Sequence, residues 1–260
     1  NMTNNTKEIL FSRQIRKSND LTINDLNKYL PALRKIDDFN FENHRTNEGV
    51  FHGLSSHGLK KIPENSIDLI ITEPPNFPIL EPNKTGNNLT ISEYLDWNQN
   101  WINDSYRILK DTGSIYIICD WKLSSMYQSI INQKFNIQTR ISWKSESKQK
   151  SNNSIWIDKL CDIWFASKSS NYLFNGLNDI QKTNFWNDNI QLKSSKTEKH
   201  PKELIKRIIE ASSCKLSWIL DPFSRIGDIG VNAIEMGRRF IGFEANKDKI
   251  LLSMKKIDRK

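Results

Sequence analysis

The sequence predicts an α/β protein in which a mostly parallel sheet carries helices on both faces. Short apolar runs rich in β-branched residues alternate with longer segments of helical spacing along most of the chain. One of these runs, residues 67–72, ends directly in Glu-Pro-Pro-Asn-Phe, and the carboxyl ends of parallel strands are where such proteins bind ligands. With 260 residues, of which 37% are hydrophobic, the chain can bury a sizeable core as one large domain or one domain with an insertion.

The predicted elements follow one another in a regular order from residue 50 onward. Strands are expected where the runs are short and β-branched or aromatic, at 50–51, 66–72, 114–119, 135–143, 160–166, 218–220 and 240–244. Helices are expected where apolar residues recur at helical spacing, at 55–61, 92–109, 123–133 and 201–212, in a segment that ends at Gly237, and in the basic C-terminal segment. Residues 110–113 are predicted as a turn, the lysine-rich stretch 144–154 as a loop, and 167–199 as irregular.

A polar, asparagine-rich extension precedes this alternation. Within it, residues 22–36 carry helical spacing, and Asn24 or Thr22 can cap the helix. We therefore expect an N-terminal helical extension over residues 1–47 and a main domain over 48–260. Exposed loops are expected near 144–156 and 175–199.

The charge balance indicates which kinds of molecule the protein can bind. Lys plus Arg is 38 and Asp plus Glu is 30, which gives a formal net charge of +8. This surplus suits nucleic acid, because lysine and arginine displace counterions from phosphates, although a solvated basic surface explains the same composition.

The cysteine, histidine and hydropathy patterns indicate the cellular environment of the protein. The three scattered cysteines and the four histidines show no metal-ligand spacing, so we expect no metal site. A reduced, intracellular protein of the cytoplasm, nucleus or nucleoid is the simplest interpretation. No apolar run is long enough to span a bilayer and no signal peptide is visible, so no membrane association is expected.

The motif Glu73-Pro74-Pro75-Asn76, followed by Phe77, resembles the catalytic motif of the DNA amino-methyltransferases. These enzymes methylate N6 of adenine or N4 of cytosine, and they write Asp, Asn or Ser, then Pro-Pro, then Tyr or Phe. An exocyclic base amine is a poor nucleophile, because its lone pair is delocalised into the ring. The resemblance implies that the acid and a proline carbonyl bind both amine hydrogens, while the aromatic stacks on a flipped-out base.

This chain departs from that motif at two positions. Glu73 keeps the acceptor chemistry but adds one methylene, which moves its oxygens by about an ångström, a misplacement that can cost ~100-fold in rate. Asn76 has no π-face, and Phe77 replaces it only if the loop shifts by one residue. An ordinary strand followed by a Pro-Pro turn is the alternative interpretation.

Further segments resemble the same family in a consistent order. They are 51–55 with 60–68, 107–115, 200–205, 220–223 and 237–244. The catalytic half comes first and the cofactor half last, which is similar to the permuted order of the β-group of these enzymes. The resemblance covers the chain from about Val50 to its C-terminus and implies a Rossmann-like methyltransferase fold.

The resemblance also implies S-adenosylmethionine as cofactor. Its expected contacts are Asp221, Phe223, Gly227, Glu244 and His200. Glu244 ends a predicted strand, where an acid can accept ribose hydroxyls, and a generic strand-end acid is the alternative.

Residues around this expected cofactor pocket depart from the family pattern together with the catalytic motif. Arg225 stands where the loop Asp-Pro-Phe-x-Gly-x-Gly-Thr-Thr has its first glycine, and Asp228 and Ile229 replace two hydroxyl donors. A side chain at position 225 removes backbone freedom and occupies space that the cofactor's methionine part uses. Leu54 replaces an acid near the cofactor's adenine, and the element His-Pro-Thr-Gln-Lys-Pro is shortened to His-Pro-Lys at 200–202.

Two lysine clusters are candidates for nucleic-acid contacts. The first lies where the family places a mobile DNA-contacting loop, and the second precedes His200. The candidate residues are Lys144, Lys148, Lys150, Lys193 and Lys196. Solvated loops are the alternative for each cluster.

Two main functions remain open. One is a site-specific DNA amino-methyltransferase that uses S-adenosylmethionine. The other is a catalytically degenerate family member that binds nucleic acid and pairs with an active second methyltransferase subunit. The non-catalytic partner of the mRNA adenine methyltransferase offers an analogy, since it carries Glu-Pro-Pro where its active mate carries Asp-Pro-Pro. The coordinated departures favour the degenerate subunit, and an RNA or protein methyltransferase has less support.

Overall fold

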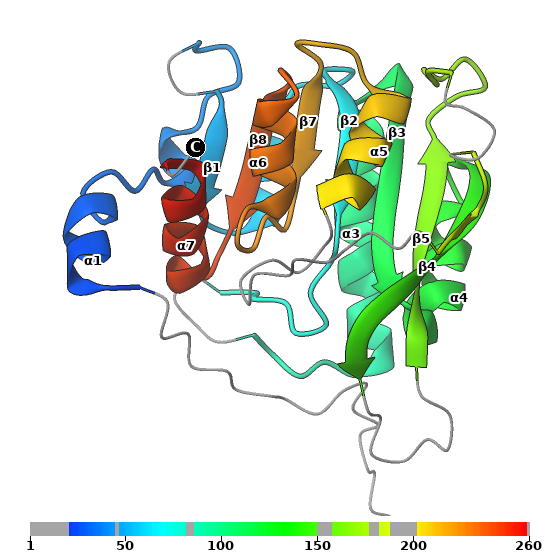
Figure 1. The fold of residues 1–260 in the computed structure, drawn as a ribbon, viewed down its shortest axis with the longest axis horizontal. Coiled ribbons are helices and arrows are strands. Elements are labelled where there is room, and N and C mark those ends of the chain that lie inside the picture. Colours follow the sequence, from blue (N-terminus) through cyan, green and yellow to red (C-terminus); the bar gives the residue numbers. More distant parts are fainter. Residues whose placement is uncertain are drawn as a thin grey trace, which may run out of the picture.

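A sheet of eight strands, in the order β1-β8-β7-β2-β3-β5-β4-β6, runs through the described part of the computed structural model (Figure 1). The structure describes residues 21–44, 47–81, 86–149, 158–176, 182–187 and 202–258. The strands are β1 (Gly49–His52), β2 (Ile67–Thr72), β3 (Leu109–Asp120), β4 (Asn136–Gln149), β5 (Asp158–Ser167), β6 (Phe185–Trp186), β7 (Trp218–Asp221) and β8 (Arg239–Glu244). Neighbouring strands pair in parallel, except that β5 is antiparallel to β3 and β4.

Helices cover both faces of this sheet (Figure 1). One layer holds α2 (Ser55–Lys60), α3 (Ile91–Ile108) and α4 (Trp121–Ile131), and the other holds α5 (Lys202–Ser212), α6 (Asp228–Glu235) and α7 (Lys247–Asp258). Because successive strand residues point to opposite faces, β2 divides its apolar side chains between the layers. Ile70 joins the core under α3, whereas Leu69 and Ile71 join the core under α5. The predicted α/β class with helices on both faces is confirmed.

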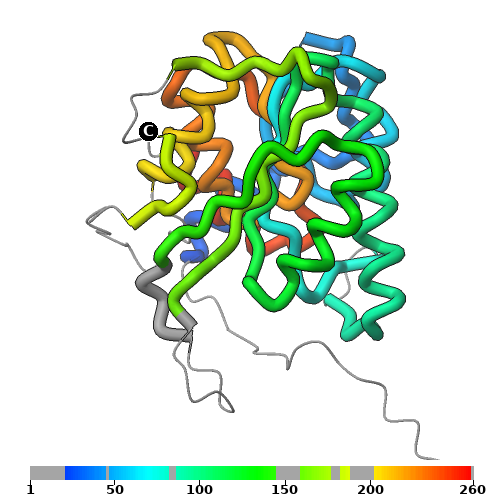
Figure 2. Tube along the Cα trace, turned by 90° about the vertical axis from the view of Figure 1, so that its right-hand side faces the viewer, coloured from blue at the N-terminus to red at the C-terminus, as the bar shows by residue number. Residues whose placement is uncertain are grey.

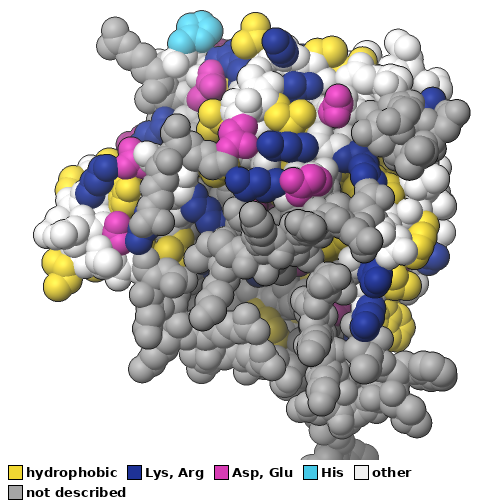
Figure 3. Space-filling view, in the orientation of Figure 1, with side chains coloured by type: hydrophobic (Ala, Val, Ile, Leu, Met, Phe, Trp, Pro, Cys, Tyr) yellow, Lys and Arg dark blue, Asp and Glu magenta, His cyan; other side chains and the backbone are white. Residues whose placement is uncertain are grey.

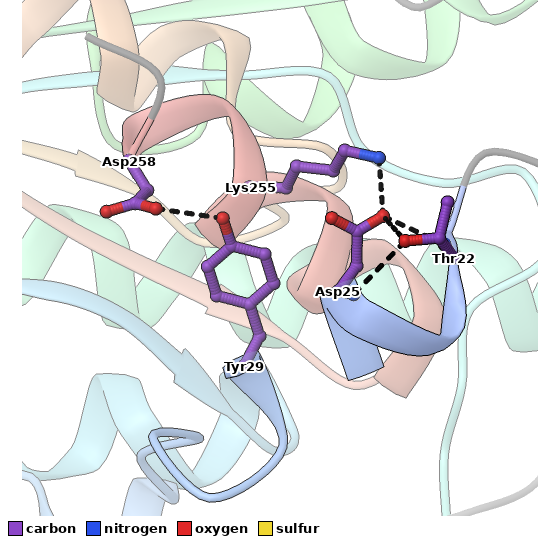
Figure 4. Close-up of polar contacts among 5 residues, drawn as sticks. All are labelled: Thr22, Asp25, Tyr29, Lys255 and Asp258. Carbon is purple, nitrogen blue, oxygen red and sulfur yellow. Dashed lines mark hydrogen bonds and ion pairs between the residues drawn. The ribbon is translucent and has the colours of Figure 1, made fainter. Parts of the chain in front are cut away.

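The N-terminal segment packs against the last helix. Helix α1 (Ile23–Tyr29) begins at the capping residue Thr22 and is followed by the short 3-10 helix η1 (Ile36–Asp38). Lys255 of α7 lies 2.6 Å from the Asp25 carboxylate, and the Tyr29 hydroxyl donates to Asp258 over 2.9 Å (Figure 4). These contacts, together with the ion pair between Lys28 and Asp258, join the start of the described chain to its end.

Three predicted boundaries differ from the structure. The predicted helix 22–36 stops at Tyr29, because Pro31 has no N–H with which to continue the helical hydrogen bonds. The predicted turn 110–113 lies inside β3, where the pairing with β2 skips from Leu109 to Ser114 and the extra residues form an irregularity. The predicted loop 144–154 begins instead as strand, because residues up to Gln149 pair with β5.

The register places the polar strand ends at one edge of the sheet. Strands β1, β8, β7, β2 and β3 are parallel, so His52, Glu244, Asp221, Thr72 and Asp120 all end at that edge. Asp120 pairs with Cys161, and Cys161 pairs with Trp143. The strand residues after Trp143 and before Cys161 therefore extend beyond the end of β3, as the tube in Figure 2 shows.

None of the helices within the described ranges is long and apolar enough to cross a membrane.

Candidate active site

A buried carboxyl group joins the ends of the two central strands. Asp221, 2% exposed, ends β7, and its Oδ1 accepts a hydrogen bond of 2.7 Å from the Thr72 hydroxyl at the end of β2. The same oxygen accepts the Phe223 N–H over 3.1 Å. Burial raises the pKa of Asp221 to about 7, although the hydrogen bonds from Thr72 and Phe223 oppose this shift. The loops that follow β2 and β7 therefore leave the sheet side by side.

An ion pair connects these two loops. The Arg225 guanidinium donates from Nη1 to Oε2 of Glu73 over 2.8 Å, and the side chains are 32% and 19% exposed. Arg225 has a φ of 51°, in the left-handed region that glycine adopts freely and other residues adopt at a cost of roughly 1 kcal/mol. The loop thus keeps a glycine-like backbone at the position where a side chain has been added, and that side chain pairs with the motif acid.

A cleft of about 320 Å³ lies beside this ion pair. Pro75, Phe77 and Trp97 line it from the side of β2, and Gly53 and Glu244 line it from the ends of β1 and β8. A smaller cavity of about 100 Å³ is lined by Glu73, Asp221, Ser224 and Asp228, among others. Three residues line both spaces, namely Phe223, Arg225 and Lys249, so Arg225 stands at the boundary between them.

A tyrosine holds the Pro-Pro loop in place. The hydroxyl of Tyr94, on α3, donates to the Pro75 carbonyl over 3.1 Å and lies 3.3 Å from the Tyr127 hydroxyl of α4. Burial raises the pKa of both phenols, so each stays protonated. The Pro75 carbonyl is the kind of acceptor that the motif chemistry needs, and it is fixed from behind by a buried side chain.

The cofactor-type loop closes with a glycine that cannot be replaced. Gly227 precedes α6 with a φ of 80°, and a Cβ atom at this position would lie 2.1 Å from the Ser253 hydroxyl of α7. The next residue, Asp228, is ion-paired with Lys256 of α7. The loop between β7 and α6 is therefore packed tightly onto α7.

The predicted site residues fall into three groups. The structure brings Glu73, Asp221 and Phe223 together around the smaller cavity, and Pro75, Phe77, Phe223 and Glu244 around the larger cleft. Pro74 is buried, Asn76 is half-buried and Gly227 caps α6, and none of these three lines either space. Phe77 is thus the aromatic residue of the motif that faces the larger cleft.

Several predicted contacts cannot be placed. His200, Lys150, Lys193 and Lys196 lie outside the described residues, and so does the side chain of Lys148. Lys144 is exposed on the part of β4 that extends beyond the sheet edge. The nucleic-acid role of these lysines stays a prediction.

Sequence reasoning missed three residues that the structure brings to this edge. Lys249 lines both spaces, Tyr94 fixes the Pro75 carbonyl, and Lys159 is exposed near Lys144 on the neighbouring strand. The only signal for Lys249 was its place in the first turn of the helix after Glu244. Tyr94 lies in the predicted helix 92–109 as one of its apolar positions, which carries no signal for a contact with Pro75.

Comparison with known proteins agrees with this arrangement. The family model of the N6/N4 DNA methylases matches residues 67–255, which is well over half of the chain. The chain belongs to the DNA methylase family. The predicted resemblance to DNA amino-methyltransferases is confirmed.

Individual relatives share sequence and fold with this DNA methylase. The DNA adenine methyltransferase YhdJ of Escherichia coli (strain K12) is 29% identical over 249 residues, which cover 80% of this chain and 82% of that protein. The PvuII DNA methyltransferase, cytosine-N4-specific, shares the fold with a TM-score of 0.64 at 19% identity, covering 79% of this chain and 84% of that chain. The M1.HpyAVI–SAM complex aligns with a TM-score of 0.60 at 19% identity, covering 80% and 98%.

S-adenosylmethionine is the cofactor by family, and the residues of this DNA methylase fit one half of it. Glu244 ends β8 at the larger cleft, where its carboxylate can accept ribose hydroxyls, and aromatic side chains line the same space. The other half fits less well, because the cofactor's tail carries a sulfonium and an ammonium cation beside its single carboxylate. Two cationic side chains, Arg225 and Lys249, line the cleft where it meets the smaller cavity.

The raised pKa of Asp221 predicts a pH dependence of stability. An acid whose folded pKa is about 7, above its unfolded value, stabilises the fold at low pH and loses that contribution as pH rises from about 4 to 7. Asp221→Asn keeps an oxygen for the Thr72 and Phe223 donors but cannot ionise. We expect its free energy of unfolding, measured with urea, to fall less between pH 4.5 and 7.5 than that of the wild type. Asp96→Asn, an exposed acid of α3, is the control, and identical slopes for wild type and Asp221→Asn would contradict this assignment.

Proposed function

We propose that this member of the DNA methylase family is a DNA-binding subunit whose own methyl-transfer site is closed by the Arg225–Glu73 ion pair, and that it supports an active methyltransferase partner inside the cell. The observation that carries this proposal is the ion pair itself, with 2.8 Å between Nη1 and Oε2. A base amine needs acceptor oxygens that localise its lone pair. In this chain the motif carboxylate already accepts from a guanidinium of the neighbouring loop, so an incoming amine must displace a paired cation.

The geometry of the pair makes that displacement unfavourable. Glu73 and Arg225 are both largely withdrawn from solvent, where separating two opposite charges costs more than at a fully exposed site. Arg225 also lines the cleft where the cationic tail of S-adenosylmethionine would approach. One side chain thus opposes both the target base and the cofactor.

The strands that extend beyond the sheet edge support the DNA-binding part of the proposal. Lys144 and Lys159 are both exposed there, on adjacent strands, close to the edge that carries the site. Elsewhere, the face that α5, α6 and α7 cover shows Lys and Arg interleaved with Asp and Glu (Figure 3). Phosphates favour clustered cations over a mixed surface, which favours the site edge as the DNA-facing side.

Apolar side chains near the same edge support a protein partner. Helices α3 and α4 both begin there, after β2 and β3, and exposed large apolar residues lie at or near their starts: Leu80, Ile91, Leu95 and Trp121, between 36% and 50% exposed. A subunit with a closed site needs an active mate to contribute to methylation. Exposed apolar residues beside the site offer that mate a contact.

A second candidate function is an active, site-specific DNA amino-methyltransferase. It is favoured by Pro75, Phe77 and Glu244, which line a single cleft in the positions where a base amine, an aromatic wall and a ribose contact are needed. The two candidates differ in whether S-adenosylmethionine binds and reacts.

Calorimetry with S-adenosylmethionine distinguishes these candidates. We expect the wild type not to bind S-adenosylmethionine at micromolar concentrations. Arg225→Gly should bind it about tenfold more tightly or better, a gain of ~1.4 kcal/mol or more. The reason is that this variant lacks the guanidinium, while its backbone keeps a conformation that suits glycine. Leu216→Gly is the matched control, since Leu216 also has a positive φ, of 66°, but is exposed away from the site. Micromolar binding and methyl transfer by the wild type would establish the active enzyme instead.

The DNA-binding role predicts a change in salt dependence. Replacing Lys144 and Lys159 together by alanine should weaken binding to duplex DNA of any sequence, and should reduce the slope of log affinity against log salt by about 2, one for each lost phosphate contact. Fluorescence anisotropy at several salt concentrations measures this slope. The control replaces Lys60 and Lys215, exposed lysines at the opposite edge of the sheet. If both double variants weaken DNA binding equally, the net charge of the protein explains the binding and the proposed DNA-facing edge is contradicted.

The partner role predicts a defined complex. Affinity purification from the native source should recover a second methyltransferase chain that binds S-adenosylmethionine, and Trp121→Ser with Leu95→Ser should reduce its recovery. Arg140→Ser on the exposed part of β4 serves as the control substitution. Recovery of this chain as a lone, active monomer would refute the partner.

A further inference from the structure

The carboxyl groups around the two cavities each have a specific partner. Glu73 is paired with Arg225, Asp228 with Lys256, and Asp221 accepts from Thr72 and Phe223 while burial favours its neutral form. Glu244 accepts the Asn246 N–H on Oε1 over 2.7 Å. The acids of the site are therefore engaged within the protein, which leaves its cations to decide what the cleft attracts.

Lys249 is the cation without a counterpart. It lies in the first turn of α7 and lines both cavities, yet among the described residues its ammonium group makes no hydrogen bond or ion pair. Burial lowers its pKa, and the nearby Arg225 acts in the same direction, whereas Glu244 and Glu73 oppose the shift. A partly buried cation of this kind is stabilised when an anion enters its surroundings.

Two cations stand together at the boundary between the cavities. Lys249 and Arg225 both line the smaller cavity and the larger cleft. Arg225 pairs with Glu73 through Nη1, and its guanidinium carries further N–H groups that can donate. The boundary thus offers an ammonium without a hydrogen-bond partner among the described residues and a guanidinium with further N–H groups, which are donors for an anionic group.

The larger cleft suits the remainder of such a ligand. Its volume of about 320 Å³ lies at the lower end of the range for small-molecule sites, about 300–1,000 Å³. Phe77, Trp97 and Phe223 offer aromatic faces on which a base can stack. Glu244 lines the same space from the end of β8, where a carboxylate can accept ribose hydroxyls.

From these contacts we infer that the cleft binds a nucleoside 5′-monophosphate, with its base and ribose in the larger cleft and its phosphate against Lys249 and Arg225. This inference rests on the proposed function, because it names what a site that is closed to methyl transfer holds instead. The added arginine changes the preferred ligand from one with a cationic tail to one with an anionic tail. The same chemistry is available from a free mononucleotide and from the 5′-phosphorylated end of a DNA strand.

Calorimetry on the full chain tests the inference with adenosine monophosphate, adenosine, S-adenosylmethionine and inorganic phosphate. We expect adenosine monophosphate to bind at least about tenfold more tightly than adenosine, equivalent to ~1.4 kcal/mol, and more tightly than S-adenosylmethionine. A 5′-phosphorylated oligonucleotide and its unphosphorylated form are compared in the same way. Preference for the phosphorylated strand over the free nucleotide would identify the strand end as the source.

Two lysines of the same helix turn provide matched variants. Lys249→Gln should reduce the affinity for adenosine monophosphate to that for adenosine and leave adenosine binding unchanged, whereas Lys247→Gln, an exposed neighbour, should change neither. Circular dichroism checks that both variants fold. Equal affinities of wild type for nucleotide and nucleoside, or no binding of any phosphorylated ligand, overturn the inference. If the wild type binds no phosphorylated ligand and transfers no methyl group, the proposed function stands and only the nucleotide inference falls. Methyl transfer by the wild type would contradict both the proposed function and the nucleotide inference.

Discussion

The buried carboxyl of Asp221 fixes the geometry on which the whole site depends. By accepting from Thr72 and from Phe223 on a single oxygen, it ties the end of β7 to the end of β2 and bends the chain into the next loop. A carboxyl this deeply buried is tolerated because both donors are fixed and because its raised pKa, of about 7, favours the neutral form. The two loops that follow these strands have no freedom to separate, and Glu73 of one loop meets Arg225 of the other.

The Arg225–Glu73 pair follows from this constraint and changes how the departures from the family pattern relate to each other. As separate substitutions, a longer acid and a missing glycine each look like partial damage to a different half of the site. Because the strands that carry them are adjacent, the two residues form one ion pair of 2.8 Å. The longer reach of a glutamate, compared with an aspartate, suits contact with the guanidinium. The structure therefore joins the catalytic and the cofactor departures in a single interaction.

The sequence predicted the fold well because the fold depends on patterns that are local. Apolar, β-branched runs such as 67–72 and 114–119 identify the central strands without any knowledge of their neighbours. The errors fall where pairing between distant segments decides the outcome. Polar residues after Trp143 form strand because β5 lies opposite them, and the turn-like residues before Ser114 lie within β3 as an irregularity. Likewise the motif residues that line the two spaces can be picked out from local sequence, whereas Lys249 and Tyr94 cannot, since their positions beside the Pro-Pro loop arise only when α7 and α3 pack there.

The cleft is open beside the Arg225–Glu73 ion pair, and this combination requires a physical reason. A site without an occupant is expected to fill with apolar side chains, because a void loses dispersion contacts on every wall. Here the backbone at Arg225 keeps a left-handed conformation that a non-glycine residue adopts only at a cost, and Tyr94 still fixes the Pro75 carbonyl. The ammonium of Lys249 stays partly buried without a hydrogen-bond or ion-pair partner among the described residues, which is itself unfavourable. Strain, an open cleft and an unsatisfied polar group together are typical of a surface selected for binding. The arrangement is therefore better explained by a ligand that satisfies this group than by the decay of an unused site.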